Sequence, residues 1–129
     1  MSPRVLAHVI GHPHDRTVKA SLKGFHRYCI QDRTYPALCR SEKTDVVVHG
    51  VLVTDLSDED VRALDDFEGS DYIRTAVQVT LADGTGKVVD TYAYLWAKGE
   101  SDPELYGTWS FEKDFLPREE ETLRGWGFL

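Results

Sequence analysis

The segment LDDFEGSDYIR, from Leu64 to Arg74, holds the residues best suited to chemistry, and Glu68 is the most informative of them. An α-helix advances about 100° per residue, so Glu68 lies only about 40° from the centre of the apolar stripe of Val61, Leu64 and Phe67. Glu68 also ends the predicted helix, where the helix dipole disfavours negative charge. Because burial and the dipole both favour the neutral acid, we expect a raised pKa, which suits a general acid or base.

A structural role for Glu68 is the competing interpretation. Glu68 could cap the following turn or pair with Arg74 across the Gly69–Asp71 loop, because ion pairs are also common at helix ends. Arg74 could instead bind a substrate carboxylate, or pair only with Asp71 or Glu68. Tyr72 could donate a hydrogen bond to a substrate or belong to the core. Spacing alone leaves these alternatives open.

Aromatic residues elsewhere in the chain are candidates for lining a substrate cavity. Tyr106, Trp109 and Trp96 could do so, although packing under the C-terminal helix explains Trp96 better. Tyr35 is a further candidate substrate-binding residue. It precedes Pro36, where the peptide bond could be cis, but the end of a strand is the simpler interpretation.

The remaining polar motifs do not define a metal or nucleophile site. His12 and His14 could form half of a metal site, but no cysteine or carboxylate pair stands nearby at ligand spacing. A polar loop is favoured, and the alternative is that both imidazoles face the cavity mouth. Cys29 and Cys39 lie in strand-like contexts, where burial argues against nucleophilic roles. We therefore predict neither a metal nor a cofactor.

Length and composition restrict the class of protein. The 129 residues suit one domain, 1–129, and the net charge of -7 argues against a nucleic-acid partner. No apolar run approaches the roughly 18 residues of a membrane span, and the first residues are too polar for a secretory signal. Two cysteines are too few for a disulfide scaffold, so we expect a reduced, cytoplasmic location. A small-molecule substrate is expected for a different reason, because an inward Glu68 beside aromatic residues suits one.

Local patterns place the candidate residues on strands and helices. Alternating or β-branched residues predict strands at 21–31, 33–40, 45–56, 72–84 and 86–99. Pro36 limits the segment 33–40 to an edge strand or an irregular segment. The strand at 45–56 is expected to be buried on both faces, with a bend or bulge at Gly50. Helices are predicted at Pro3–Ile10 and at 57–68, the latter with a capping box. The segment 110–129 is predicted to form a helix that is interrupted at Pro117 and ends in a tail.

These elements predict an α+β fold in which antiparallel strands are covered by helices. The strand count suggests a small mixed β-barrel that is closed or nearly closed. Closure is an inference from that count, because no local pattern shows it.

Five motifs in this chain resemble those of the gamma-glutamylcyclotransferase-like superfamily, in particular its plant and fungal avirulence-induced-gene branch. They are LKGFHRY, TYPAL, VHGVLV, LDDFEGSDYIR and DPELYGTWSFE, in the family's order. The resemblance implies a small mixed β-barrel flanked by helices, with a cavity at its mouth. It also implies that Glu68 is the catalytic acid/base. In the family this Glu takes a proton from the substrate α-amine, which attacks the γ-carbonyl and releases 5-oxoproline.

One family motif, Tyr-Gly-Ser/Thr-Leu on a first strand, has no counterpart before Pro3. In the family its backbone N–H groups hold the substrate carboxylate. Either this sequence lacks the first strand of the family, or the chain acts on a substrate without a γ-glutamyl group. A missing strand would expose backbone edges, so we predict that a neighbouring chain or the N-terminus covers the seam. Cover by a neighbouring chain would make the protein a homo-oligomer.

Three functions remain compatible with the sequence. The first is a gamma-glutamylcyclotransferase-type acyltransferase that uses Glu68 as general acid/base. The second is a relative recruited to proton-transfer isomerisation, cyclisation or elimination on a small metabolite. The third is a non-enzymatic binding domain in which Glu68 is structural. None of the three involves a nucleic acid or a membrane.

Overall fold

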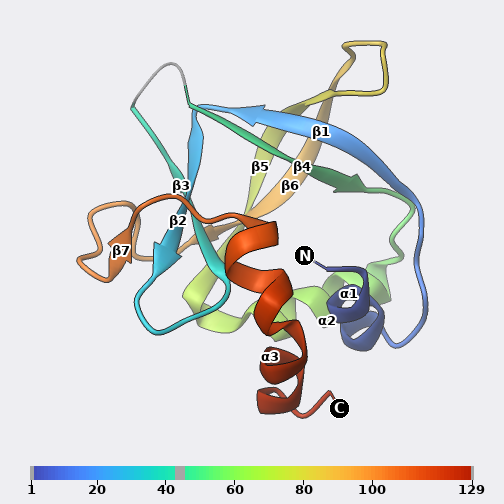
Figure 1. Cartoon of the computed structure of the whole chain (residues 1–129). Helices are drawn as coiled ribbons and strands as arrows, with labels where there is room; N and C mark the ends of the chain where they lie inside the picture. Colours follow the sequence, from blue (N-terminus) through green and yellow to red (C-terminus); the bar gives the residue numbers. More distant parts are fainter. Residues whose placement is uncertain (1, 43–45, 129) are drawn as a thin grey trace.

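Residues 2–42 and 46–128, which this computed structural model describes, form two antiparallel sheets and three α-helices (Figure 1). The strands are β1 (Thr17–Lys23), β2 (Phe25–Ile30), β3 (Pro36–Arg40), β4 (Val47–Val53), β5 (Tyr72–Leu81), β6 (Val88–Trp96) and β7 (Leu105–Tyr106). The helices are α1 (Pro3–Ile10), α2 (Asp58–Glu68) and α3 (Glu119–Gly125), with short turns η1 (Gly69–Asp71), η2 (Phe111–Phe115) and η3 (Leu116–Arg118). The predicted α+β class is confirmed.

The two sheets have the strand orders β4-β1-β5-β6 and β3-β2-β7. No ladder between the described strands joins one sheet to the other, although β3 and β6 lie in contact. Trp96 of β6 packs in one cluster with Ala37 and Cys39 of β3. Closure into a barrel therefore stays a prediction, as does the covering of a seam by a neighbouring chain.

Gly24 separates two strands where the sequence predicted one. The single strand expected at 21–31 is wrong, because β1 and β2 lie on either side of Gly24 in different sheets. Gly24 has φ +79°, a conformation that glycine adopts without steric cost. Its N–H donates to the carbonyl of Val46, and its carbonyl accepts from the N–H of Ser41. The chain therefore turns at Gly24 and leaves the first sheet.

Strand β4 is more exposed than its sequence suggested. The segment 45–56 was expected to be buried on both faces, but β4 is an edge strand and Val51 is 53% exposed. Gly50 pairs with Ala20 in an uninterrupted register, so a bulge there is wrong, while a bend at Gly50 stays a prediction. Residue 45 lies outside the described residues. β-branched residues suit any pleated surface, and the composition therefore could not tell an edge from a centre.

The helix ends follow from local sequence. Gly11 ends α1 in the left-handed conformation, as predicted, and Ser2 begins it by accepting the N–H of Val5. At the start of α2, the Ser57 hydroxyl accepts the Asp60 N–H, and the Asp60 carboxylate accepts the Ser57 N–H. This is the predicted capping box, and it fixes where α2 begins.

The C-terminal segment packs against α2. It forms η2, η3 and α3 in succession, and Pro117 lies in η3, so the interruption predicted there is confirmed. The segment contributes to a hydrophobic core cluster. The buried residues of that cluster are Val5, Cys29, Trp109, Phe115 and Leu123. Phe67, which immediately precedes Glu68 on α2, packs against this cluster. The core therefore holds the last turn of α2 in place.

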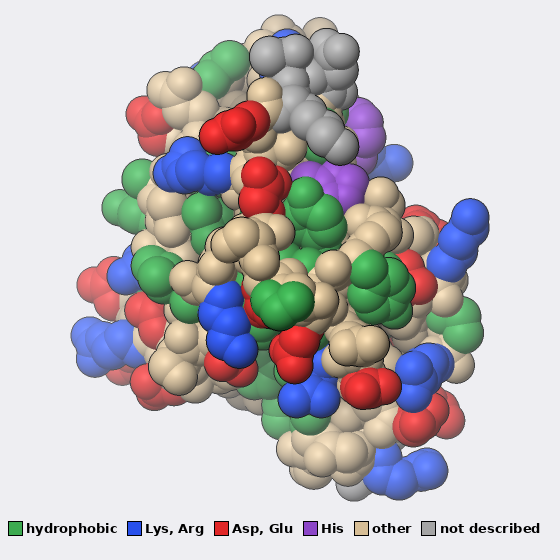
Figure 2. Space-filling view, turned by 90° about the vertical axis from the view of Figure 1, so that its left-hand side faces the viewer, with side chains coloured by type: hydrophobic (Ala, Val, Ile, Leu, Met, Phe, Trp, Pro, Cys, Tyr) green, Lys and Arg blue, Asp and Glu red, His purple; other side chains and the backbone are tan. Residues whose placement is uncertain are grey.

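The surface is mixed in character. Figure 2 shows the face that lies to the left in Figure 1, where acidic, basic and hydrophobic side chains are interspersed. Neither sign of charge gathers into a large patch on this face. Among residues 2–42 and 46–128, no helix is both long enough and apolar enough to cross a membrane.

Candidate functional site

A glycine turn links Glu68 to the strand that follows it. Helix α2 ends at Glu68, η1 follows, and β5 begins at Tyr72. Gly69 has φ +64° and ψ −152°, a conformation almost confined to glycine, and its N–H donates to the carbonyl of Asp65. This turn brings the end of α2 and the start of β5 together, as the spacing in LDDFEGSDYIR suggested.

Glu68 is a half-buried acid without a polar partner. Its carboxylate makes no hydrogen bond or ion pair with any residue in the described ranges 2–42 and 46–128. Burial raises the pKa of Glu68 from 4.5 to about 7. The expected direction of the pKa shift is therefore confirmed. The side chain is present in both protonation states at neutral pH, which a group that accepts and returns a proton requires.

Two tyrosines lie close enough to Glu68 for its charge to raise their pKa values, after the larger effect of their own burial. The Tyr72 hydroxyl donates to the carbonyl of Pro36 at 2.7 Å. The Tyr94 hydroxyl donates to Asp65 Oδ1 at 2.5 Å. Both hydroxyl protons are thus engaged elsewhere, which leaves the Glu68 carboxylate without a donor from either ring.

Arg74 pairs with Asp65 rather than with the acids expected from the sequence. Its Nε lies 3.1 Å from Asp65 Oδ1. A structural ion pair between Glu68 and Arg74, or between Asp71 and Arg74, is therefore not formed. Asp65, which the helix geometry placed on the flank of α2, is the anchor for both Arg74 and Tyr94.

Aromatic rings form a wall beside the end of α2. Tyr35 lies 6.5 Å from Tyr72 and 6.0 Å from Trp126, measured between ring centroids. Trp126 meets Phe67 edge to face at 5.4 Å. Trp126 belongs to the segment that the sequence described only as a tail, and no spacing rule placed it here.

An open surface pocket of about 330 Å³ lies between the end of α2 and strands β5 and β6. It is lined by Asp65, Gly69, Tyr72, Ile73, Arg74 and Tyr94. Sequence reasoning missed Tyr94 as a member of the site. The signal was present in the hairpin, because Tyr94 pairs directly with Arg74 across β5 and β6.

The other aromatic candidates lie elsewhere in the fold. Tyr106 is on β7 and is 57% exposed. Trp109 is buried, and its Nε1 donates to the carbonyl of Thr34 at 2.8 Å. Trp96 is buried in the cluster between β3 and β6 rather than under the C-terminal helix, and its Nε1 donates to Asp102 Oδ2. A substrate-binding role for Tyr106 and Trp109 stays a prediction.

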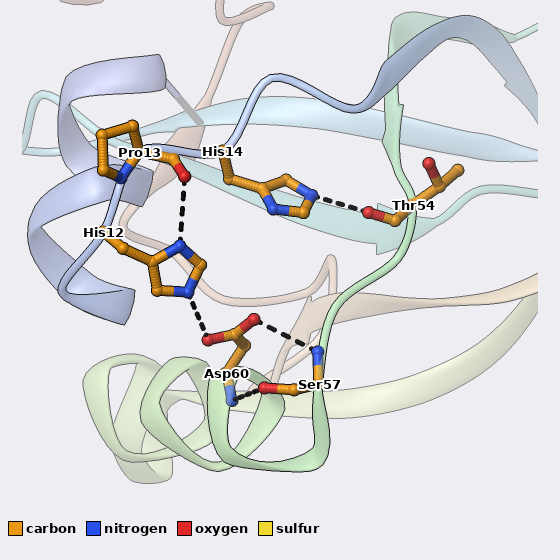
Figure 3. A network of polar contacts seen from close by, with 6 residues as sticks. All are labelled: His12, Pro13, His14, Thr54, Ser57 and Asp60. Atoms are coloured by element: carbon orange, nitrogen blue, oxygen red, sulfur yellow. Dashed lines mark hydrogen bonds and ion pairs between the residues drawn. The ribbon is translucent and has the colours of Figure 1, made fainter.

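His12 and His14 tie the loop after α1 to its neighbours (Figure 3). His12 Nε2 lies 2.9 Å from Asp60 Oδ1, and its Nδ1 lies 3.1 Å from the carbonyl of Pro13. His14 Nε2 lies 2.6 Å from the carbonyl of Thr54. The imidazoles therefore serve as polar links within a loop. In the part of the chain that the structure describes, no three His, Cys, Asp or Glu residues are grouped as metal ligands.

The two cysteines are buried and free. Burial raises the pKa of both thiols, to about 11 for Cys39. A thiol with so high a pKa carries almost no thiolate at neutral pH. This agrees with the expectation that neither cysteine is a nucleophile.

Comparison with known proteins identifies the family. The model of the family described as "Gamma-glutamyl cyclotransferase, AIG2-like" matches residues 2–111. The chain belongs to this family, and the resemblance seen in its motifs is confirmed.

The relatives include proteins of Arabidopsis thaliana. The chain is 41% identical to "AIG2-like protein D" over 100 residues, which are 76% of this chain and 62% of that protein. It is 36% identical to "Protein AIG2 C" over 114 residues, which are 88% of this chain and 66% of that protein. The chain thus spans less than two thirds of the length of either relative.

Two solution structures of Arabidopsis thaliana proteins share the fold. One has a TM-score of 0.72 and is 31% identical in sequence. The match covers 98% of this chain and 74% of the chain in that structure. The other has a TM-score of 0.73 and is 26% identical in sequence. The match covers 97% of this chain and 80% of the chain in that structure. The arrangement of sheets and helices is therefore that of the family.

Proposed function

We propose that this chain is a gamma-glutamylcyclotransferase-type acyltransferase acting on a small molecule, with Glu68 as its general acid/base. The observation that carries the proposal is the environment of Glu68. The carboxylate is half-buried, has no polar partner among residues 2–42 and 46–128, and has a pKa of about 7. Family membership supplies the reaction type.

The proposed reaction begins with proton transfer from the substrate. Ionised Glu68 takes a proton from the α-ammonium group and so produces the neutral amine that a nucleophilic attack needs. The amine nitrogen forms a bond to the γ-carbonyl carbon, and the γ-amide bond to the leaving amine breaks. Protonated Glu68 returns its proton to the leaving nitrogen. The attacking nitrogen still carries two protons after the attack, and it gives one of them to the departing amine, which leaves in its ammonium form. The products are 5-oxoproline and a free amine or amino acid.

Tyr35, Tyr72 and Arg74 are the substrate-binding residues in this proposal. Tyr72 lies next to Glu68 and forms part of the pocket wall. Tyr35 extends the aromatic wall toward Trp126. Arg74 supplies a positive charge in the pocket wall beside the end of α2, where Asp65 holds it in place. These contacts support the assignment by proximity and charge.

Release of 5-oxoproline tests the proposal. The purified chain is incubated with γ-glutamyl amides and γ-glutamyl dipeptides, and the cyclic product is measured by mass spectrometry. Glu68→Gln preserves size and removes the base, so we expect the rate to fall by about 10²–10⁴-fold. Asp66→Asn is the matched control, because Asp66 is an exposed acid on the same helix. No release by the unaltered chain, or equal rates for both variants, would refute the proposal.

A further inference from the structure

The end of α3, which the sequence described only as a tail, is a defined turn. Gly127 has φ +80°, and its N–H donates to the carbonyl of Arg124 at 3.0 Å. The Phe128 N–H donates to the carbonyl of Leu123 at 2.8 Å. Two such bonds around a left-handed glycine form a Schellman motif, which ends a helix and folds the following residue back against it. The turn therefore fixes where the rings of Trp126 and Phe128 lie.

Helix α3 is held against the core, so the turn that follows it has a fixed place. Leu123 is fully buried. The hydroxyl oxygens of Thr122 and Thr34 lie 2.9 Å apart, which ties α3 to the residue before Tyr35. Trp126 packs against the same core cluster as Leu123. The indole ring is thus part of the packed structure of the protein.

Trp126 connects two aromatic neighbours of Glu68. Its ring meets Phe67, the residue before Glu68, edge to face at 5.4 Å. It also lies 6.0 Å from the ring of Tyr35, which in turn lies 6.5 Å from the ring of Tyr72. Tyr72 is close enough to Glu68 for the charge of the acid to raise its pKa. Through Tyr35, one indole ring therefore links the neighbour of Glu68 on α2 to the neighbour on β5.

We propose that Trp126 is a positioning residue for Glu68, because its ring holds Phe67 and Tyr35 where they exclude water from one side of the carboxyl group. Loss of a large ring from a packed cluster leaves space that is filled by collapse or by water, and water favours the charged form of a carboxyl group. Trp126 takes no part in proton transfer. The family match covers residues 2–111, so this role comes from a segment that lies after it.

This inference rests on the proposed function only for its catalytic meaning. A general base has to be ionised before it accepts a proton, so the pKa of Glu68 sets the lowest pH at which the reaction runs well. Without Trp126, Glu68 would ionise at lower pH and the low-pH limit of activity would move down with it. The pKa itself can be measured without a substrate.

Burial dominates the titration of Glu68. It is the larger influence and raises the pKa, whereas the positive charge of the amino terminus lowers it. The other ionisable side chains of this region are Asp65 on α2, Asp71 on η1, Tyr72 and Arg74 on β5, and Tyr94 on β6. On α1, His8 stacks on Phe128 with the ring centroids 5.0 Å apart. Because burial is the larger influence, a fall in the pKa on loss of Trp126 reports the entry of water.

The pKa of Glu68 in Trp126→Leu tests the proposal. The full chain is labelled with ¹³C, and the side-chain carboxyl group of Glu68 is titrated by NMR. We expect the pKa to fall from about 7 by about one pKa unit or more, since full burial of a carboxyl group raises its pKa by up to about 3–5 units. Trp126→Phe keeps an aromatic ring and should give a smaller fall. An unchanged pKa in Trp126→Leu would overturn the proposal.

Phe111→Leu is the matched control. Phe111 is a partly buried ring that packs against the same core cluster as Trp126. Its ring partners are Trp109 at 6.2 Å and Phe115 at 5.6 Å, which lie outside α2. We expect the pKa of Glu68 to stay near 7 in this variant. An equal fall in Phe111→Leu would show a general loosening of the core and would contradict the proposal.

Gly127→Ala provides a second variant if Trp126→Leu does not fold. An ideal Cβ at Gly127 meets no atom within 4 Å, so the change strains only the turn that places the two rings. The pKa of Glu68 should again fall, and an unchanged value would then overturn the proposal. Each titration is repeated with His8→Gln, which removes the imidazole that stacks on Phe128. The fall should persist, and its disappearance would assign the effect to His8 and refute the role of Trp126.

The outcomes separate this inference from the proposed function. A lower pKa of Glu68 in Trp126→Leu supports the role of Trp126 even if the unaltered chain releases no 5-oxoproline, a result that refutes the cyclotransferase alone. Release of 5-oxoproline together with an unchanged pKa in the variant supports the cyclotransferase and refutes the role of Trp126. If both hold, the low-pH limb of the rate of release should move down with the pKa of Glu68 and by the same amount.

Discussion

The two ends of helix α2 carry two acids in opposite situations. At the N-terminal end, Asp60 is buried and accepts from the backbone of Ser57 while pairing with His12 (Figure 3). The His12 contact first, and then the Ser57 N–H, hold the pKa of Asp60 below its usual 3.8. At the C-terminal end, Glu68 has no hydrogen-bond or ion-pair partner among residues 2–42 and 46–128, and burial raises its pKa to about 7. The partners of a buried acid, more than its burial, decide whether it is structural or available for proton transfer.

The ends also differ in how they are held. The N-terminal end is fixed by side chains, through the capping box and through His12. The C-terminal end is held by the backbone of Gly69, by Phe67 in the core, and by the contacts of Asp65 with Arg74 and Tyr94. None of these contacts involves the Glu68 carboxylate, which has no hydrogen-bond partner among residues 2–42 and 46–128. Such a partner would stabilise the charged form and lower the pKa of Glu68.

The largest loss of stability is expected from Gly69→Ala. An ideal Cβ at Gly69 meets no atom within 4 Å, so the cost comes from the backbone conformation alone. Such a conformation costs a non-glycine residue about 1–3 kcal/mol. Urea denaturation measures it, with Gly125→Ala as the control at a glycine outside the positive φ region. Equal effects of the two changes would show that the turn does not hold the C-terminal end.

Glu68→Gln is expected to stabilise the protein above neutral pH. The folded pKa of Glu68, about 7, lies above the usual 4.5, so the protein has this stability in full below pH 4.5 and loses it as the pH rises through 7. The variant avoids that loss. It should be more stable than the unaltered chain at pH 8 by about 1–3 kcal/mol, a value reduced for partial solvent screening.

The measurement is urea denaturation of both proteins at pH 4.5 and at pH 8. The difference in unfolding free energy between Glu68→Gln and the unaltered chain should be larger at pH 8 than at pH 4.5. A difference that does not change with pH would contradict the assigned environment of Glu68.

Ser57→Ala is expected to cost about 1 kcal/mol, the usual value for an N-cap serine. Ser57 accepts the Asp60 N–H at 3.1 Å, and its loss leaves a helical donor unpaired. The pKa of Glu68 should stay near 7, because the change is at the opposite end of the helix. Thermal denaturation measures the loss of stability, and side-chain NMR measures the pKa of Glu68. A parallel shift in the pKa of Glu68 would show that the two ends are not independent.

The smallest effect is expected at His12. Both ring nitrogens face acceptors, Asp60 Oδ1 and the carbonyl of Pro13, which only the doubly protonated imidazolium satisfies. The contact with Asp60 raises the pKa of His12 above 6.5. Its stabilisation is therefore complete below pH 6.5 and is lost as the pH rises through the raised value.

The comparison is between the unaltered chain and His12→Gln. The gap in melting temperature should be largest at pH 5 and should narrow above neutral pH. His14 lies 6.3 Å from His12 between ring centroids, so His14→Gln is the control for the second imidazole. A gap that widens with pH would contradict the imidazolium assignment.

Local sequence patterns correctly predicted the features that depend on interactions between residues close in sequence. The capping box at Ser57, the stop at Gly11 and the inward direction of Glu68 all follow from a single helix and its ends. Gly24 and β4 were misjudged, because a change of sheet and an edge position depend on which strands pair across long stretches of sequence.

The site was predictable in part for the same reason. Glu68, Tyr72 and Arg74 lie within one short segment, and the turn brings them together. Tyr94 and Trp126 come from distant segments, and only the pairing of β5 with β6 and the packing of the C-terminus place them there.

The most direct test is a ¹³C NMR titration of the side-chain carboxyl groups of Glu68 and Asp60 in the same protein. Their assignments are checked with Glu68→Gln and Asp60→Asn. This account predicts that Glu68 titrates near pH 7 and that Asp60 titrates below 3.8. Titration of Glu68 near its usual 4.5 would contradict the account, because it would show a solvated or partnered acid at the C-terminal end of α2.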